Sequence, residues 1–363
     1  RIRKEILMRS RAESNCHHSL RRAVFYPLKY ESKALHIILY WGAMNRPVLV
    51  CCSVFVCYFL LIIYSFRGYY TQPFDASYWK DKYEHSQWKL PLSQRIIGDD
   101  GLYLYEGYRL IRGADPSLFN AEVPPLGKYM IGAFTLFTNH PYLYGLPTTA
   151  AVLVVFFLFC RSLFPTKRWV FLTTLLFALD PLLVRQFHLT MMESLQLFFL
   201  LLFLLALHRS NIGRKRIFVV LAGISIGLFS QTKAPLFTPL FFLLAVWYLR
   251  RVVLFSVSAL AGYLLPYANF FLLGHTLVDF LKVQKWIVAF YESSKLSPNI
   301  GSVFSTILAN QYQNLFTGAF ESVSEWSISW PIALLLGFIG LTLNKRMRSV
   351  LLVGTAGVLL ILS

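Results

Sequence analysis

Charged residues are scarce in this sequence, and acidic residues are the scarcest. Only 14% of the 363 residues are charged, against roughly 25% in ordinary soluble domains, and 17 acidic residues stand against 35 basic ones. This composition is not that of a soluble globular domain. The sequence also lacks a Gly-rich phosphate loop, so we do not expect a nucleotide-sugar donor. Its five cysteines show no metal-ligand spacing, and we interpret them as packing or lipid-facing residues.

Long apolar runs take up most of the chain. Hydrophobic residues make up 56% of it and aromatic residues 17%, and several runs reach the roughly 18 to 20 residues that cross a bilayer. The predicted fold class is an all-α integral membrane protein, a polytopic helical bundle with a basic tail over 1–46 and a transmembrane domain over 47–363. We predict about nine crossings, of which the sixth and eighth are short, at 47–66, 142–160, 169–184, 190–207, 217–231, 236–249, 252–273, 331–343 and 349–363.

The basic residues indicate which loops face the cytoplasm. They gather in the N-terminal tail and in every second short loop, whereas the intervening short loops carry only Arg185 and Lys233. This alternation predicts a multi-pass protein with the tail inside and two long loops, 67–141 and 274–330, on the outer face. The clusters are short, so the net charge of +18 does not indicate a nucleic-acid surface. The basic residues of the short loops are Arg161, Lys167, Arg168, Arg209, Arg214, Lys215, Arg216, Arg250, Arg251, Lys345, Arg346 and Arg348.

The first outer loop is too long and too patterned to be a simple connector. Its segment GLYLYEGYRLIRG has near-helical apolar spacing and ends at Gly113, which predicts a helix. A second helix is predicted from Pro124, in PPLGKYMIGAFTLF, lying on the membrane surface. The sequence therefore predicts a helical first outer loop.

Acidic residues stand at two places in this loop. Asp99 and Asp100 precede the first predicted helix, and one of them is a candidate N-cap. A cap uses one carboxylate, so the second is expected to meet water, a cation or a reacting group. Glu122 lies just before the proline pair. A solvated loop carboxylate is the alternative interpretation of Glu122.

The order of these residues resembles that of a known family. The DD pair at 99–100 is followed by GYRLIRGADP and by EVPPLGKYMIG at 122–132. This order resembles the first outer loop of the protein O-mannosyltransferase family and its bacterial relatives, which include the aminoarabinose transferases of lipid A. Further along, LDPLLVRQFHLTMMESLQLFF and GLFSQTKAPLF resemble later segments of the family and contain Glu193 and Lys233. Two positions depart from the family pattern, Asp100 for glutamate and Val123 for histidine or lysine.

The resemblance implies a membrane glycosyltransferase with the glycosyltransferase C fold, placed in a bacterial plasma membrane with its active site on the extracytoplasmic face. Such an enzyme transfers a sugar, with inversion, from a polyprenyl-phosphate carrier in the lipid bilayer to a hydroxyl of a protein, lipid or glycan. It needs a base for the acceptor hydroxyl and cations for the departing phosphate. The implied site has Asp99 as the base, Asp100, Glu122 and Glu193 around it, and Lys128, Arg185 and Lys233 as phosphate ligands.

Several alternatives remain open at this point. The implied chemistry requires no cofactor, and the alternative is a divalent metal held by Asp99, Glu122 and His188. Lys233 can also be interpreted as a lysine that snorkels to the membrane interface. At the level of the whole chain, a transporter or lipid-carrier flippase and a non-catalytic lipid-binding scaffold are the competing classes. The chain starts at Arg1 and stops inside an apolar run, so we expect both ends to be incomplete.

Overall fold

The computed structural model describes residues 46–90, 92–213, 215–233, 235, 238–293, 302–314 and 318–343. The chain divides into two compact units, Arg1–Leu61 and Ile62–Ser363. The described part of the first unit lies wholly in helix α2 (Arg46–Ser65), whose range coincides with that of the first predicted crossing. The predicted basic tail up to residue 45 and the predicted crossing at 349–363 lie outside the described residues.

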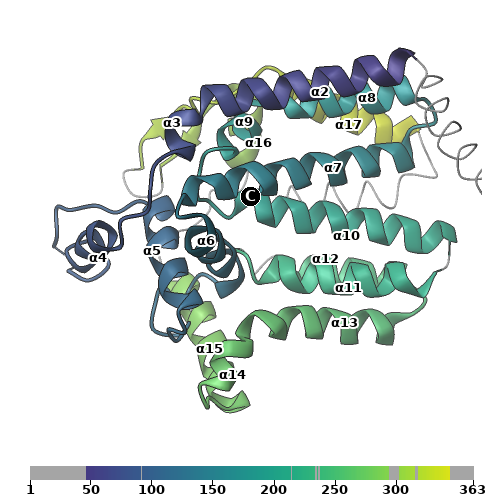
Figure 1. Ribbon diagram of the computed structural model, residues 1–363. Coiled ribbons are helices and arrows are strands. Elements are labelled where there is room, and N and C mark those ends of the chain that lie inside the picture. Colours follow the sequence, from purple (N-terminus) through teal and green to yellow (C-terminus); the bar gives the residue numbers. More distant parts are fainter. Residues whose placement is uncertain are drawn as a thin grey trace, which may run out of the picture. The chain divides into compact units, whose positions relative to one another are not determined.

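The second unit is mostly helical (Figure 1). Its one described sheet is a short antiparallel pair in which Tyr312 lies opposite Glu321. Its elements in chain order are α3 (Arg67–Tyr70), α4 (Ala76–Glu84), α5 (Asp99–Ile111), α6 (Pro125–Thr138), η1 (Pro141–Tyr144), α7 (Gly145–Leu163), α8 (Lys167–Ala178), α9 (Pro181–Gln186), α10 (Glu193–Gly213), α11 (Arg216–Ser230), α12 (Thr238–Tyr248), α13 (Val252–Leu264), η3 (Leu265–Tyr267), α14 (Ala268–Leu272), α15 (Leu277–Ser293), α16 (Ser302–Ala309), β1 (Tyr312–Gln313), β2 (Phe320–Glu321) and α17 (Ser329–Leu343).

Three helical segments in the described part of the chain are long and apolar enough to cross a membrane: Pro141–Leu163, Glu193–Gly213 and Val252–Leu272. They coincide with three of the predicted crossings. The third predicted crossing, at 169–184, is interrupted, because α8 ends at Ala178 and a separate six-residue helix follows. The break arises at Asp180, whose carboxylate accepts the backbone N–H groups of Leu182 and Leu183 and which precedes a proline.

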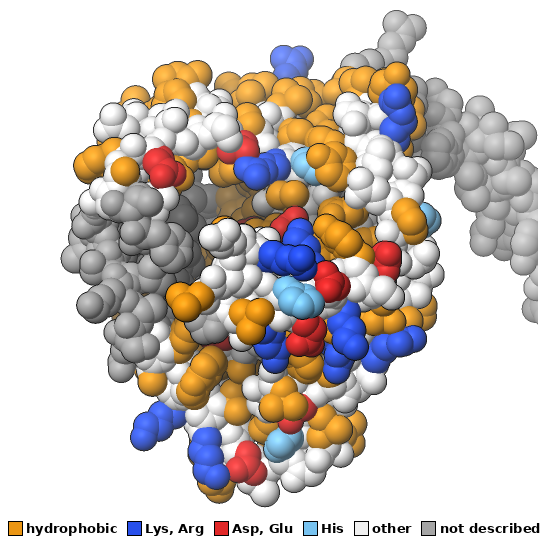
Figure 2. Space-filling model, turned by 90° about the vertical axis from the view of Figure 1, so that its left-hand side faces the viewer, with side chains coloured by type: hydrophobic (Ala, Val, Ile, Leu, Met, Phe, Trp, Pro, Cys, Tyr) orange, Lys and Arg blue, Asp and Glu red, His pale blue; other side chains and the backbone are white. Residues whose placement is uncertain are grey.

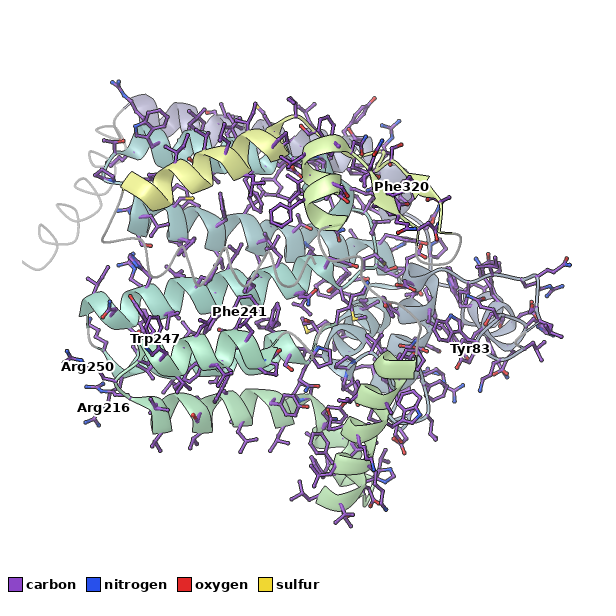
Figure 3. The ribbon with its side chains drawn as sticks, turned by 180° about the vertical axis from the view of Figure 1, so that it is seen from behind. Tyr83, Arg216, Phe241, Trp247, Arg250 and Phe320 are labelled. Atoms are coloured by element: carbon purple, nitrogen blue, oxygen red, sulfur yellow. The ribbon has the colours of Figure 1, made fainter. Side chains whose placement is uncertain are left out.

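The long helices of the second unit lie side by side in the order α8, α7, α10, α11 and α13. Helix α7 lies between α8 and α10, and α11 lies between α10 and α13. Short connections join α7 to α8 and α10 to α11, so these neighbours run in opposite directions. Figure 3 shows Arg216 and Arg250 at one end of these helices and Tyr83 at the other. The basic connections and the first outer loop are therefore at opposite ends of the helices.

Aromatic side chains fill the space between α10, α11 and α12. Phe241 of α12 is fully buried and meets Phe203 and Phe229 edge to face, with ring centroids 6.2 and 5.7 Å apart. This arrangement is the preferred one for aromatic pairs. The contact fixes α12 beside the pair α10 and α11.

The predicted first outer loop, residues 67–141, contains the two expected helices, α5 and α6. Helix α5 ends near Gly113, whose φ is +92°, and α6 starts immediately after Pro124. These parts of the prediction are confirmed. The two helices cross closely, because a Cβ atom on Gly107 or on Gly132 would overlap the backbone of the other helix. Only glycine permits this approach.

Candidate functional site

Lys233 forms the centre of a group of charged side chains in the second unit. Its Nζ lies 2.6 Å from Oε1 of Glu193 and 3.6 Å from Oδ2 of Asp99. The hydroxyl of Tyr103 donates a hydrogen bond to the same Asp99 oxygen at 3.2 Å. We call Asp99, Glu193 and Lys233 the acid–lysine triad. The structure thus brings together three residues that lie in three separate segments of the sequence.

The order of the helices explains why these residues meet. Glu193 is the first residue of α10, and Lys233 lies in the turn that follows α11, which runs back beside α10. Two further hydrogen bonds attach the first outer loop to the segments that precede α10 and follow α11. The N–H of Leu126 donates to the carbonyl of Gln231 at 3.1 Å, and the hydroxyl of Thr190 donates to the carbonyl of Asp100 at 3.0 Å.

Asp99 and Asp100 lie inside the first turn of α5 rather than before it. The N-cap is Gly98, and no side chain makes a capping hydrogen bond. The expectation that one aspartate caps the helix is therefore wrong. Carboxylates in the first turn still interact favourably with the helix dipole. The Asp99 carboxylate is 49% exposed, so it is held by Tyr103 and Lys233 yet remains accessible.

The charge of Lys233 is stabilised by its acidic neighbours. Burial works against the ammonium, but Glu193 and Asp99 outweigh this effect and raise the pKa of Lys233. The side chain of Lys233 is 29% exposed. The interpretation of Lys233 as a lysine that only snorkels to the membrane interface is disfavoured, because its ammonium is engaged with two carboxylates. The group of three carries two acids and one cation, so a bound phosphate would have to replace a carboxylate at Lys233.

Lys128 has a different environment from the one that we expected. Its side chain is 1% exposed, and its Nζ lies 3.0 Å from Oε2 of Glu106. The same ammonium donates to the carbonyls of Phe119 and Asn120, at 3.0 and 2.6 Å. These three partners match the three N–H donors of a lysine. The structure therefore gives Lys128 a structural role, and we withdraw it as a phosphate ligand.

Sequence reasoning missed Glu106, the partner of Lys128. Its side chain has no exposed surface, and it lies two turns beyond Asp99 on the same helix. Burial raises the pKa of Glu106 to about 7, although Lys128 acts to lower it. The available signal was an acid within GLYLYEGY, a stretch with no other charged residue, since acids are almost never fully buried unless they are paired.

Two other predicted site residues lie outside the acid–lysine triad. Glu122 is buried and accepts a hydrogen bond from Nδ2 of Asn120 at 2.6 Å, so it is not a solvated loop carboxylate. Burial also raises the pKa of Glu122. Arg185 lies on α9 and forms an ion pair with Glu325, which precedes α17. Arg185 is thus paired with an acid of the predicted second outer loop, a residue that sequence reasoning did not identify.

The alternative metal site does not form in the described part of the chain. The ring of His188 stacks on Phe66 at 4.1 Å between centroids and lies 4.6 Å from Tyr69. Among the described residues, no group of three or more histidine, cysteine, aspartate or glutamate side chains is placed to hold a metal ion. Asp99, Glu122 and His188 therefore do not make a common site.

Charged residues of both signs gather at one end of the second unit. Figure 2 views the molecule from the end where α4, α5 and α6 lie and shows acidic, basic and histidine side chains close together on that face. The acid–lysine triad lies at this end, since α5 and α10 both begin there. No protein-family model matches the chain, and no curated protein or solved structure matches it.

Proposed function

We propose that this chain is an inverting glycosyltransferase that takes a sugar from a polyprenyl-phosphate carrier and transfers it to a hydroxyl acceptor. On this proposal it is a multi-pass protein with the glycosyltransferase C fold, in a bacterial plasma membrane, and its site lies on the extracytoplasmic face. The observation that carries the proposal is the meeting of Asp99, Glu193 and Lys233, with the Asp99 carboxylate about half exposed. An accessible carboxylate beside a cation provides the two groups that the reaction needs.

The proposed reaction is a single displacement. The acceptor hydroxyl gives its proton to the Asp99 carboxylate as its oxygen forms a bond to the anomeric carbon. The bond from that carbon to the phosphate oxygen breaks, and the phosphate leaves with the electron pair. Lys233 stabilises the negative charge that develops on the leaving phosphate. Attack opposite to the leaving group inverts the configuration at the anomeric carbon.

The ion pairs of Lys233 suggest an order of events. Lys233 is engaged with Glu193 at 2.6 Å and more loosely with Asp99 at 3.6 Å. An arriving phosphate would replace the weaker of these partners, Asp99. The exchange leaves the Asp99 carboxylate free to accept the proton of the acceptor hydroxyl. Donor binding and activation of the base are thereby coupled through Lys233.

The placement of the charges favours this function over a transporter. Transporter sites generally lie near the middle of the membrane. In this chain Glu193 begins the apolar helix α10, and Lys233 follows the end of α11. Charges at helix ends suit a carrier lipid whose tail stays in the bilayer while its phosphate is at the interface.

The proposed orientation can be tested with single cysteines in a background without native cysteines. Cysteines at Ser117 and Ser322 are expected to react with an impermeant thiol reagent added to intact cells, because both lie in loops assigned to the outer face. A cysteine at Thr166, between α7 and α8, is the matched inner control and should react only after permeabilisation. Labelling of Thr166→Cys from outside, or protection of either outer cysteine, would contradict the single-face arrangement.

Binding of the carrier phosphate is tested by Lys233→Gln. We expect the affinity for polyprenyl phosphate to fall about 10- to 100-fold, because the substitution removes a charge-assisted hydrogen bond. The loss should change little with salt, since a partly buried charge is screened weakly. Lys80→Gln, an exposed lysine of α4, is the control and should bind as the parent does. An unchanged affinity in Lys233→Gln would remove this residue from the donor site.

A further inference from the structure

A cavity of about 580 Å³ lies beside α5, at a place to which the reaction above assigns no role. Its walls come from the end of α4, from α5 and the two loops that flank it, and from α15. Aromatic rings form much of the lining, which also contains carboxylate, amide and lysine side chains. The residues that matter for its chemistry are Tyr83, Trp88, Trp286, Glu106, Asn120 and Glu122.

Two buried oxygen atoms of this lining have neither a hydrogen bond nor an ion pair in the described part of the chain. They are Oε1 of Glu106 and Oδ1 of Asn120. Glu106 is fully buried, and Nδ2 of Asn120 is already bound to Glu122, which leaves the amide oxygen as the free group. Buried polar atoms without partners are costly. Both atoms accept hydrogen bonds, so a ligand that satisfies them must donate.

The charges around the cavity favour a neutral ligand. Glu106 already faces Lys128 at 3.0 Å, so an organic cation would meet a carboxylate that is already paired. Of the two lysines in the lining, Lys282 is bound to Asp279 at 3.0 Å and Lys89 lies over the ring of Tyr83. An anion would have to disrupt these contacts. A neutral donor of several hydrogen bonds meets neither obstacle.

We propose that the cavity binds a neutral, hydroxyl-rich ring, that is, the ring of a sugar. Ring hydroxyls would donate to Glu106 and Asn120, and the apolar face of the ring would lie against Trp286 or Trp88. Asp99 and Glu106 are seven residues apart on α5, about 10 Å at 1.5 Å per residue, so the cavity and the acid–lysine triad share this helix about two turns apart. This inference rests on the proposed function in one respect: it takes the ring to belong to a substrate of that reaction.

The test is direct binding of sugars to the full chain in lipid nanodiscs. Methyl glycosides of mannose, glucose and galactose are titrated by calorimetry, with inorganic phosphate and tetramethylammonium as the anionic and cationic probes. We expect saturable binding of at least one glycoside. Trp286→Ala or Trp88→Ala, whichever removes the stacking surface, should weaken this binding about tenfold. Trp247→Ala is the matched control, because Trp247 is 81% exposed on α12 and lies outside the cavity.

The inference is overturned if no glycoside binds saturably, or if neither tryptophan substitution in the cavity weakens glycoside binding. It is also overturned if only phosphate or only tetramethylammonium binds and the tryptophan substitutions abolish that binding. Competition with a polyprenyl-phosphate sugar then identifies the source of the ring. Simultaneous binding assigns the cavity to the acceptor, and mutual exclusion assigns it to the donor sugar. Because glycoside binding needs no transfer, a failure here leaves the role of Asp99 untouched, and an inactive transferase does not affect this result.

Discussion

Asp99→Asn protein is expected to transfer sugar on the order of 100- to 10,000-fold more slowly than the parent, which is the typical loss on removal of a general base. The amide keeps the shape of the carboxylate but cannot take the proton of the acceptor hydroxyl. The fold should survive, because the Asp99 side chain is about half exposed and Oδ1 of asparagine can still accept the bond from Tyr103. Initial rates of transfer, with donor affinity measured alongside, check this expectation.

Two comparisons make this result specific to Asp99. Asp81→Asn removes an exposed carboxylate from α4 and should transfer at the parent rate. Asp100→Asn should lose less activity than Asp99→Asn, because Asp99 and not Asp100 contacts Tyr103 and Lys233. Parent-like transfer by Asp99→Asn would show that this carboxylate is not the base. Glu193 would then be the acid to test next.

Lys128→Met is expected to lower the free energy of unfolding by about 3 to 5 kcal/mol, the usual cost of leaving one member of a buried ion pair alone. The substitution leaves the carboxylate of Glu106 without its cation and two backbone carbonyls without their donor. Thermal and chemical unfolding in detergent measure the change. The exposed control Lys80→Met should unfold within about 0.5 kcal/mol of the parent. Parent-like stability of Lys128→Met would contradict the structural role given to Lys128.

The penalty of Lys128→Met should depend on pH. The pKa of Glu106 is raised to about 7 in the folded chain. A raised carboxyl pKa means that the folded chain holds the proton of Glu106 more tightly than the unfolded chain does. The stability that this preference provides is fully present below the pKa of Glu106 in the unfolded chain and is lost as the pH rises through about 7. In Lys128→Met protein the pKa of Glu106 should rise further, because the ammonium that lowers it is gone. The destabilisation should therefore be smaller at about pH 5.5, where Glu106 is neutral, than at about pH 8.

The helices of the first outer loop could be predicted because their ends carry local signals. Pro124 and Gly113 fix the backbone at the start of α6 and just beyond the end of α5, whatever surrounds them. The interruption of the third crossing was missed, although Asp180 and Pro181 together are a known helix-start signal. Its apolar residues concealed the break, because hydropathy averages over the whole window.

The proximity of Glu193 and Lys233 could be predicted in part from the sequence. Alternating basic loops place both residues at the same ends of antiparallel helices, and the structure brings them to 2.6 Å. The pairing of Lys128 could not be read in the same way. Whether Lys128 faces the membrane or the interior depends on how α5 and α6 cross, and that crossing depends on Gly107 and Gly132, which lie far apart in sequence. The motif around Lys128 alone therefore predicts a phosphate ligand, and only the crossing of the two helices shows the pairing with Glu106.

The central claim, that the chain binds a polyprenyl-phosphate carrier through the acid–lysine triad, is tested most directly by the lipids that copurify with it. Parent protein and Lys233→Gln are purified in parallel from the same host, and their bound lipids are identified by mass spectrometry. The account predicts a polyprenyl phosphate or its sugar conjugate on the parent and much less of it on Lys233→Gln. Equal amounts on both proteins, or none on the parent above that on an unrelated membrane protein, would contradict it.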